Sequence, residues 1–241
     1  MILVCVVALG AVITGVALNK PRPRGVRGAE AEALAQQMLQ SVNVAAWKET
    51  GAVRFTFANH RHLWDRRRGY DRIESGSRSV LLRISDRTGR AWENGAETTG
   101  ERANKLVRDA YAQWVNDSFW LNPVVKIFDN GVTRSLVRNE TGGARLLVEY
   151  ASGGVTPGDA YLWTPGAGTS PPTEWRMWVH VLPIGGLATS WERWTDLSTG
   201  ARVSTLHRMG PFTIELKDVA GARTLQELLN GAEDPFAPLV R

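Results

Sequence analysis

Apolar and polar residues alternate in short runs along most of the chain from residue 53 to residue 219. In the clearest run, Phe212–Val219, the apolar residues Phe212, Ile214 and Leu216 alternate with polar ones, as in a strand with one buried face. Such runs recur about every dozen residues, with turn-forming residues between them, which is typical of an antiparallel meander. We count about eleven strands. The main predicted strands are Val53–Ala58, one or two within Leu63–Ile73, Ser79–Ser85, Val124–Phe128, Val132–Arg138, Arg145–Tyr150, Asp159–Thr164, Glu174–Leu182, Leu187–Leu197, Arg202–Arg208 and Phe212–Val219, with a further short one near Trp92.

Two segments have the period of a helix instead. Ala29–Val42 carries one apolar stripe, and a second stripe runs through Thr98–Trp114, where Thr98 and Glu101 have the spacing of a capping box. Asn116-Asp117 interrupts the second stripe, and Pro123 bars further helix. Each helix needs a sheet face to cover, so the pattern predicts an α+β fold in which helices lie against a large curved sheet.

The two ends of the chain lack the strand and helix patterns of the central part. Residues 1–18 carry no charge and would reach about 27 Å as a helix, so they fit either a signal peptide or an uncleaved membrane anchor. Residues 19–28 form a Pro/Arg linker, residues 29–230 the folded domain and residues 231–241 a tail. The basic residues follow the apolar segment, whereas a signal peptide has them before it.

Charge and cysteine content narrow the classes of partner. The net charge of +5 includes four basic residues in the first 27 positions, which hold no acid. The rest of the chain has 25 basic and 24 acidic side chains, so we expect no nucleic-acid partner. Cys5 is the only cysteine, which excludes an intramolecular disulfide.

Several short motifs carry a resemblance to a known fold. These motifs are His60 with Trp64-Asp65, Trp114 with Asn116–Leu121, Lys126 with Asp129 and Gly131, and Gly154–Asp159 with Tyr161. They resemble the LolA/LolB lipoprotein-carrier fold, and in particular a LolA-like family of unknown function from bacterial envelopes. The resemblance implies a half-open barrel, that is, a strongly curved antiparallel sheet of about eleven strands covered by helices, with an apolar interior for acyl chains. It also implies the periplasmic side of the envelope. The leader departs from the family, because it lacks a basic start.

Tryptophan is unusually frequent, with ten residues against six phenylalanines. Indole rings suit a cavity that is apolar but has polar edges, yet they also suit an ordinary core, and both interpretations stay open. If the cavity exists, its expected ligand-binding residues are Trp64, Tyr111, Trp114, Trp120, Trp163, Trp178, Trp191 and Trp194.

Four polar residues are candidates for the rim of that cavity, namely His60, Asp65, Asp117 and Lys126. The alternative for Asp117 is a backbone cap at a chain reversal after the helix. His60 and His62 would share one face of a strand, with the spacing of two metal ligands. The sequence offers no convincing third and fourth ligand, so we expect no metal and no cofactor.

No nucleophile elbow, zinc-protease motif or dinucleotide fingerprint occurs, and we therefore expect no enzyme. The leading hypothesis is a non-catalytic envelope protein that binds a lipid, acyl chain or lipoprotein under a helical lid. It would contact the membrane through residues 1–18 if these are uncleaved. One alternative is a hydrolase or isomerase that uses Asp117, His60 or Asp65 as acid or base. Another is a structural, membrane-tethered interaction module filled by its own tryptophans.

Overall fold

The computed structural model describes residues 19–152 and 157–240, and the chain divides into two compact units. Of the described residues, unit 1 comprises 19–41, 126–152, 157–191 and 207–213, and unit 2 comprises the others. The proposed signal peptide or anchor, residues 1–18, lies outside the described residues. Within the described part of the chain, no helix combines the length and the apolar character needed to cross a membrane.

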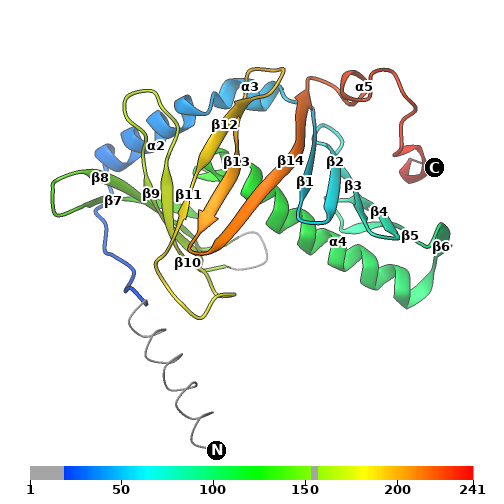
Figure 1. The fold of residues 1–241 in the computed structure, drawn as a ribbon, viewed down its shortest axis with the longest axis horizontal. Coiled ribbons are helices and arrows are strands. Elements are labelled where there is room, and N and C mark those ends of the chain that lie inside the picture. Colours follow the sequence, from blue (N-terminus) through cyan, green and yellow to red (C-terminus); the bar gives the residue numbers. More distant parts are fainter. Residues whose placement is uncertain (1–18, 153–156, 241) are drawn as a thin grey trace, which may run out of the picture. The chain divides into compact units, whose positions relative to one another are not determined.

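The main element of unit 2 is a nine-stranded antiparallel sheet with the strand order β12-β13-β14-β1-β2-β3-β4-β5-β6 (Figure 1). Hairpins join β1 to β6 in sequence, and the C-terminal strand β14 returns to pair with β1. The tip of the β13–β14 hairpin is grouped with unit 1. The strands are β1 (Ala52–Phe57), β2 (His60–Asp65), β3 (Tyr70–Ser75), β4 (Arg78–Arg83), β5 (Thr88–Glu93), β6 (Ala96–Thr98), β12 (Glu192–Asp196), β13 (Arg202–Met209) and β14 (Phe212–Ala222).

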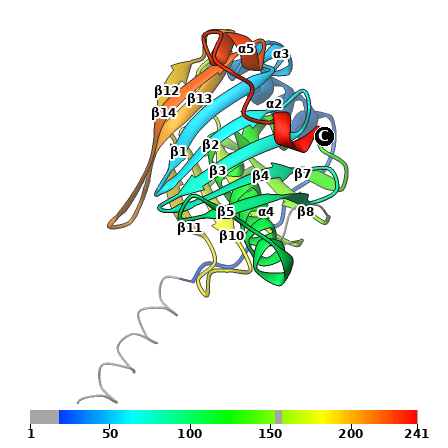
Figure 2. The same cartoon turned by 90° about the vertical axis from the view of Figure 1, so that its right-hand side faces the viewer.

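Helix α4 (Gly100–Leu121) covers one face of this sheet, and the C-terminal segment covers the other (Figure 2). Leu106, Val107 and Ala110 of α4 pack on Ile73, Val80 and Leu82 of the strands, which forms one core. A second core, on the opposite face, joins Leu63 and Leu81 to helix α5 (Leu225–Leu228) and to Phe236. The short helix α3 (Val44–Glu49) adds Trp47 to a third cluster around Phe55 and Leu121. Apolar side chains are therefore buried on both faces of the sheet.

Unit 1 is built on a five-stranded antiparallel sheet with the order β11-β10-β9-β8-β7. Helix α2 (Ala29–Ser41) packs against β7 and β8, and Arg134 of β7 binds Glu32 of the helix at 2.9 Å. The strands are β7 (Val132–Arg138), β8 (Ala144–Tyr150), β9 (Ala160–Thr164), β10 (Glu174–Trp178) and β11 (Leu187–Ser190).

The expected α+β class and the antiparallel pairing are confirmed, but the single half-open barrel is wrong. The chain forms two open sheets, and neither is closed or strongly curled. The nine-stranded sheet ends at β12 and at β6, which has only three residues. A sheet buries its apolar residues without closing when other elements cover both faces, as α4 and the C-terminal segment do here.

The break between the sheets falls inside one predicted strand, Leu187–Leu197. Trp191 separates β11 from β12, and its amide donates to the carbonyl of Thr173 at 2.8 Å. Before this residue the chain pairs with β10, and after it the chain pairs with β13. No Gly or Pro marks this change of partner, so the sequence alone does not reveal it.

Three local predictions near α4 are also wrong. The helix does not end near Trp114 but continues through Asp117 to Leu121, and Val124–Phe128 is not a strand. A 3₁₀ turn, η1 (Pro123–Lys126), follows the helix instead. The expected capping box does not form, because Thr99 is the N-cap residue and makes no side-chain capping bond. The helix continues through the expected interruption at Asn116-Asp117, because Asp117 and the following Ser118 are buried inside its packed face.

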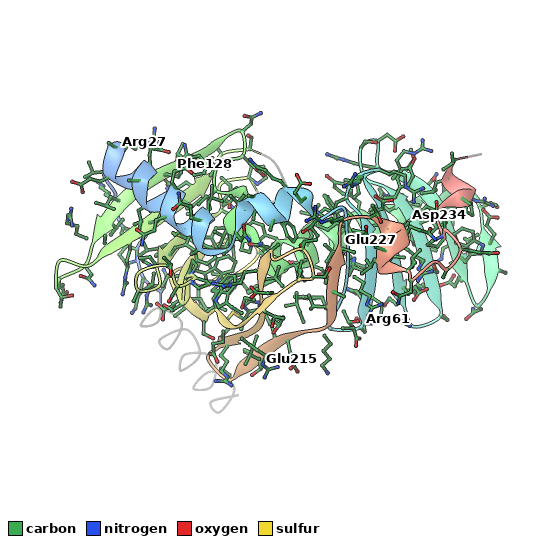
Figure 3. The ribbon with its side chains drawn as sticks, turned by 90° about the horizontal axis from the view of Figure 1, so that it is seen from above. Arg27, Arg61, Phe128, Glu215, Glu227 and Asp234 are labelled. Atoms are coloured by element: carbon green, nitrogen blue, oxygen red, sulfur yellow. The ribbon has the colours of Figure 1, made fainter. Side chains whose placement is uncertain are left out.

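Residues 231–240, where we expected a tail, pack on unit 2. Phe236 is fully buried against Tyr70, with ring centroids 5.8 Å apart, and Leu239 is also buried. The guanidinium of Arg68 binds both carboxylate oxygens of Asp234, at 2.7 and 3.0 Å. Figure 3 shows Glu227 of α5 and Asp234 on the same side of the strands of unit 2. The C-terminal segment is therefore part of the core.

We predict that Phe236→Ala lowers the free energy of unfolding of unit 2 by about 3 kcal/mol, because it leaves a cavity against the sheet. The matched control is Val240→Ala, four residues later, whose side chain is 67% exposed and whose loss should cost less than about 0.5 kcal/mol. Urea unfolding followed by circular dichroism measures both. Equal midpoints for the two variants would contradict the packing described.

Candidate functional site

The candidate site lies in unit 2, where α4 crosses β2. His60, His62 and Trp64 alternate along β2 and therefore face the same side of the sheet, toward α4. Asp71 of the neighbouring strand β3 pairs with Trp64 and so shares that face. Asp117 projects from α4 onto the two histidines.

These four side chains form one chain of polar contacts, which we call the His–Asp cluster (His60, His62, Asp71 and Asp117). Oδ2 of Asp117 lies 2.8 Å from Nδ1 of His60 and 3.0 Å from Nε2 of His62. Nδ1 of His62 lies 2.7 Å from Oδ2 of Asp71. His62 thus bridges the two carboxylates, and both imidazoles converge on a single oxygen of Asp117.

The surroundings hold the imidazole of His62 in place. Its ring stacks on Phe55 of β1, with centroids 4.5 Å apart and an interplanar angle of 7°. The two residues are paired in the β1–β2 register, so the strand pairing sets the stack. Asn116 donates from Nδ2 to Oδ1 of Asp117 at 2.8 Å. Asn116 thus occupies Oδ1 of Asp117, and the two histidines contact the other oxygen, Oδ2.

The cluster is charged and almost entirely removed from water. His62, Asp71 and Asp117 are buried, and the side chain of His60 is 21% exposed. Burial alone would lower the pKa of His62, but the carboxylates of Asp71 and Asp117 outweigh it and raise the pKa to about 9. Burial raises the pKa of Asp71, and the neighbouring imidazole opposes that shift. Oδ1 of Asp71 has no hydrogen-bond partner among the described residues.

Three donor atoms of the cluster are close enough to bind one metal ion. They belong to His60, His62 and Asp117 and all lie within 4.8 Å of one another. Within the described ranges, this is the group of histidine and acidic side chains that meets such a criterion. Imidazole nitrogen and carboxylate oxygen are ligands that first-row transition metals accept.

Aromatic rings flank the His–Asp cluster at both ends. Trp64 of β2 contacts Trp114 of α4 in a T-shaped pair at 5.5 Å, and Tyr111 lies 5.9 Å from Trp114. At the other end, Phe57 of β1 lies 6.5 Å from Trp120. Asp117 is one helical turn from each of the two tryptophans of α4. We call these five partly buried residues, Phe57, Trp64, Tyr111, Trp114 and Trp120, the aromatic group.

The remaining expected ligand-binding residues are elsewhere. Trp163 and Trp191 belong to unit 1, where they are 1% and 2% exposed and pack on Trp175 at 4.9 and 4.8 Å. Trp178, also in unit 1, is partly buried and donates to the carbonyl of Lys20. Trp194 lies on β12 of unit 2 and is partly buried. Trp163 and Trp191 therefore sit in a ring-filled core, not along an open surface.

Two of the expected rim residues are apart from the cluster. Asp65 faces the opposite side of β2, where Oδ1 accepts from the amides of Arg67 and Arg68. It organises the turn after β2 and does not contact His60. Lys126 belongs to unit 1 and forms an exposed pair with Asp129 at 3.4 Å. Asp117 is not a cap at a chain reversal, because it lies within α4.

Asp71 was missed from the sequence. One signal was present, since Asp71 and Ile73 share a strand face that the pattern marks as apolar. A carboxylate at such a position needs a buried partner. The sequence places His62 on the same strand face as His60. Its partner on the next strand depends on the β2–β3 register, which the sequence does not define.

No family model matches the chain, and no curated protein matches it either.

We predict that Asp117→Asn destabilises unit 2 by about 3 kcal/mol, because the buried imidazolium of His62 loses one of its two counter-charges. The matched control on the same helix is Asp109→Asn. Asp109 forms an exposed pair with Lys105 at 2.6 Å, and its loss should cost less than about 0.5 kcal/mol. Urea unfolding in the presence of a chelator measures the difference. If the two variants unfold at the same midpoint, the cluster does not stabilise the packing of α4.

Proposed function

We propose that this protein is a non-catalytic bacterial envelope protein that binds a lipid or acyl chain through unit 2. In this proposal the apolar chain lies against the aromatic group, and an oxygen of the ligand headgroup accepts a hydrogen bond from Trp114. Residues 1–18 serve as the export signal or the membrane anchor that brings the domain to the periplasmic side.

The observation that carries the proposal is the indole nitrogen of Trp114. This N–H is buried and has no hydrogen-bond partner among the described residues. A buried donor without an acceptor costs about 1–3 kcal/mol, and native proteins seldom leave one unpaired. A ligand that supplies both an apolar chain and an acceptor oxygen would satisfy this donor.

The neighbours of Trp114 support an amphiphilic ligand. Tyr111, Trp64 and Trp120 are partly buried, and they lie on the side of the sheet that faces α4 or on α4 itself. Removing a few hundred Å² of acyl surface from water would contribute several kcal/mol to the free energy of binding, at about 25 cal/mol per Å². His60 is the exposed edge of the His–Asp cluster and provides a polar contact between the two tryptophans of α4.

A hydrolase is the second candidate, and the pairing of His60 with Asp117 favours it. A buried carboxylate that holds a partly exposed imidazole at 2.8 Å is an arrangement that orients a general base. Turnover of long-chain esters by the wild type, lost in His60→Gln while the circular dichroism spectrum is unchanged, would favour this candidate. Absence of turnover favours a binding protein.

We predict that a photoactivatable fatty acid, added to membranes that contain the full-length protein, crosslinks to peptides within residues 57–64 and 111–120. Trp114→Ala should reduce this crosslinking at least about fivefold, because it removes both the donor and the largest ring contact. Mass spectrometry of the crosslinked peptides measures the yield at each position.

The control variant is Trp92→Ala. Trp92 is a partly buried tryptophan of the same sheet, but it packs with the core on the opposite face, beside Leu81. Its loss should leave crosslinking at residues 111–120 unchanged. Crosslinks confined to residues 1–18, or an equal loss in both variants, would contradict the proposed binding surface.

A further inference from the structure

We propose that His60, His62 and Asp117 form a binding site for a divalent transition-metal ion, with Zn²⁺ as the ion that fits the donor set best. The inference departs from the expectation of no metal that the sequence alone supports. It rests on the His–Asp cluster and does not depend on the binding of a lipid.

Three possible metal-binding atoms converge in the His–Asp cluster. Nδ1 of His60 and Nε2 of His62 both approach Oδ2 of Asp117, at 2.8 and 3.0 Å. Ligand atoms about 2.0–2.1 Å from a tetrahedral zinc ion lie about 3.3 Å apart. The two nitrogen-to-oxygen spacings therefore need to open by about 0.3–0.5 Å for an ion to enter. The two nitrogens themselves lie within 4.8 Å of one another.

Asp71 contacts the ring nitrogen of His62 that faces away from Asp117. Histidine ligands usually donate their other ring N–H to a carboxylate, which fixes the ring and strengthens the ligand. Nδ1 of His62 lies 2.7 Å from Oδ2 of Asp71, while Nε2 is directed at Asp117. The stack on Phe55 holds the same ring from the side. His62 thus has the outer support that a metal-binding histidine requires.

The negative charge of the buried carboxylates also favours a cation at this position. Asp71 and Asp117 are 0% and 1% exposed, and Oδ1 of Asp71 has no hydrogen-bond partner among the described residues. Two buried carboxylates are costly unless positive charge compensates both of them. A divalent ion supplies that charge where the two histidines and Asp117 meet, and it takes the place of the proton on Nε2 of His62, which is released to solvent.

The donor set also indicates the kind of site. Two imidazoles and one carboxylate leave a fourth position of a tetrahedral ion open, as in catalytic or ligand-binding zinc centres. The partly exposed side chain of His60 gives an ion a route from solvent. Calcium and magnesium prefer oxygen ligands, which makes them poor candidates.

The test uses the full-length protein, purified with a tag that contains no histidine, stripped with a chelator and titrated with Co²⁺. We expect one Co²⁺ ion to bind with the visible absorption of a tetrahedral site and to be displaced by Zn²⁺. Zn²⁺ at about 100 times its Kd should raise the Tm of unit 2 by roughly 5–10 °C.

The decisive variant is His60→Gln. Glutamine can still donate a hydrogen bond to Asp117, so a purely structural cluster tolerates it, whereas a zinc site loses a ligand. We expect His60→Gln to keep the apo Tm within a few degrees and to lose Co²⁺ binding. Asp71→Asn should weaken binding about 10–100-fold, because it removes the support behind His62.

The matched control is His180→Gln in unit 1. His180 also pairs with a buried aspartate, Asp159, at 3.0 Å, but its side chain is 64% exposed and it belongs to no three-ligand group within the described residues. Its loss should leave the titration unchanged. The site is refuted if the folded wild type binds no Co²⁺ or Zn²⁺, if His60→Gln binds as tightly as the wild type, or if His180→Gln loses binding equally.

Discussion

The structure of unit 2 depends on a chain of buried charge that links α4 to the sheet. Asp117 reaches from the helix to His62, and His62 reaches across to Asp71 on the next strand. Charges in such a setting persist only when each has a partner at hydrogen-bonding distance. The position of α4 along β2 is therefore fixed by chemistry as well as by apolar packing. A shift of the helix by one residue would rotate Asp117 about 100° away from both imidazoles.

The contacts along α4 follow one order. Trp114 meets Trp64, Asp117 meets the two histidines, and Trp120 meets Phe57. The polar cluster thus lies between two groups of aromatic rings. Low polarity around a charged group strengthens its contacts with its partners, and it also makes an unmatched charge more costly. The rings on either side of the cluster are only partly buried, so one arrangement serves both the burial of charge and the proposed contact with an apolar chain.

The sequence predicted the strands well because their alternation is local, and β7 was predicted with its observed bounds, Val132–Arg138. What it could not supply were features that depend on partners distant in the chain. Ser190 ends its pairing in one sheet and Glu192 begins to pair in another, although no Gly or Pro marks a break between residues 187 and 197. Asp117 looked like a turn residue because an acid in an apolar stripe is unfavourable unless a buried cation faces it. Its partners lie 55 and 57 positions earlier in the chain.

A buried ion network is weak evidence for stability, since well-packed apolar residues of the same volume often stabilise a protein as much or more. The details of this network therefore matter more than its existence. Attachment of α4 to the sheet would require only one pair, and His62 with Asp117 already provides it. His60 adds a second nitrogen to the same oxygen and brings the cluster to the surface, while Asp71 places a further carboxylate behind His62. One ion pair between α4 and the sheet would need neither addition, whereas a site that receives an ion from solvent needs both.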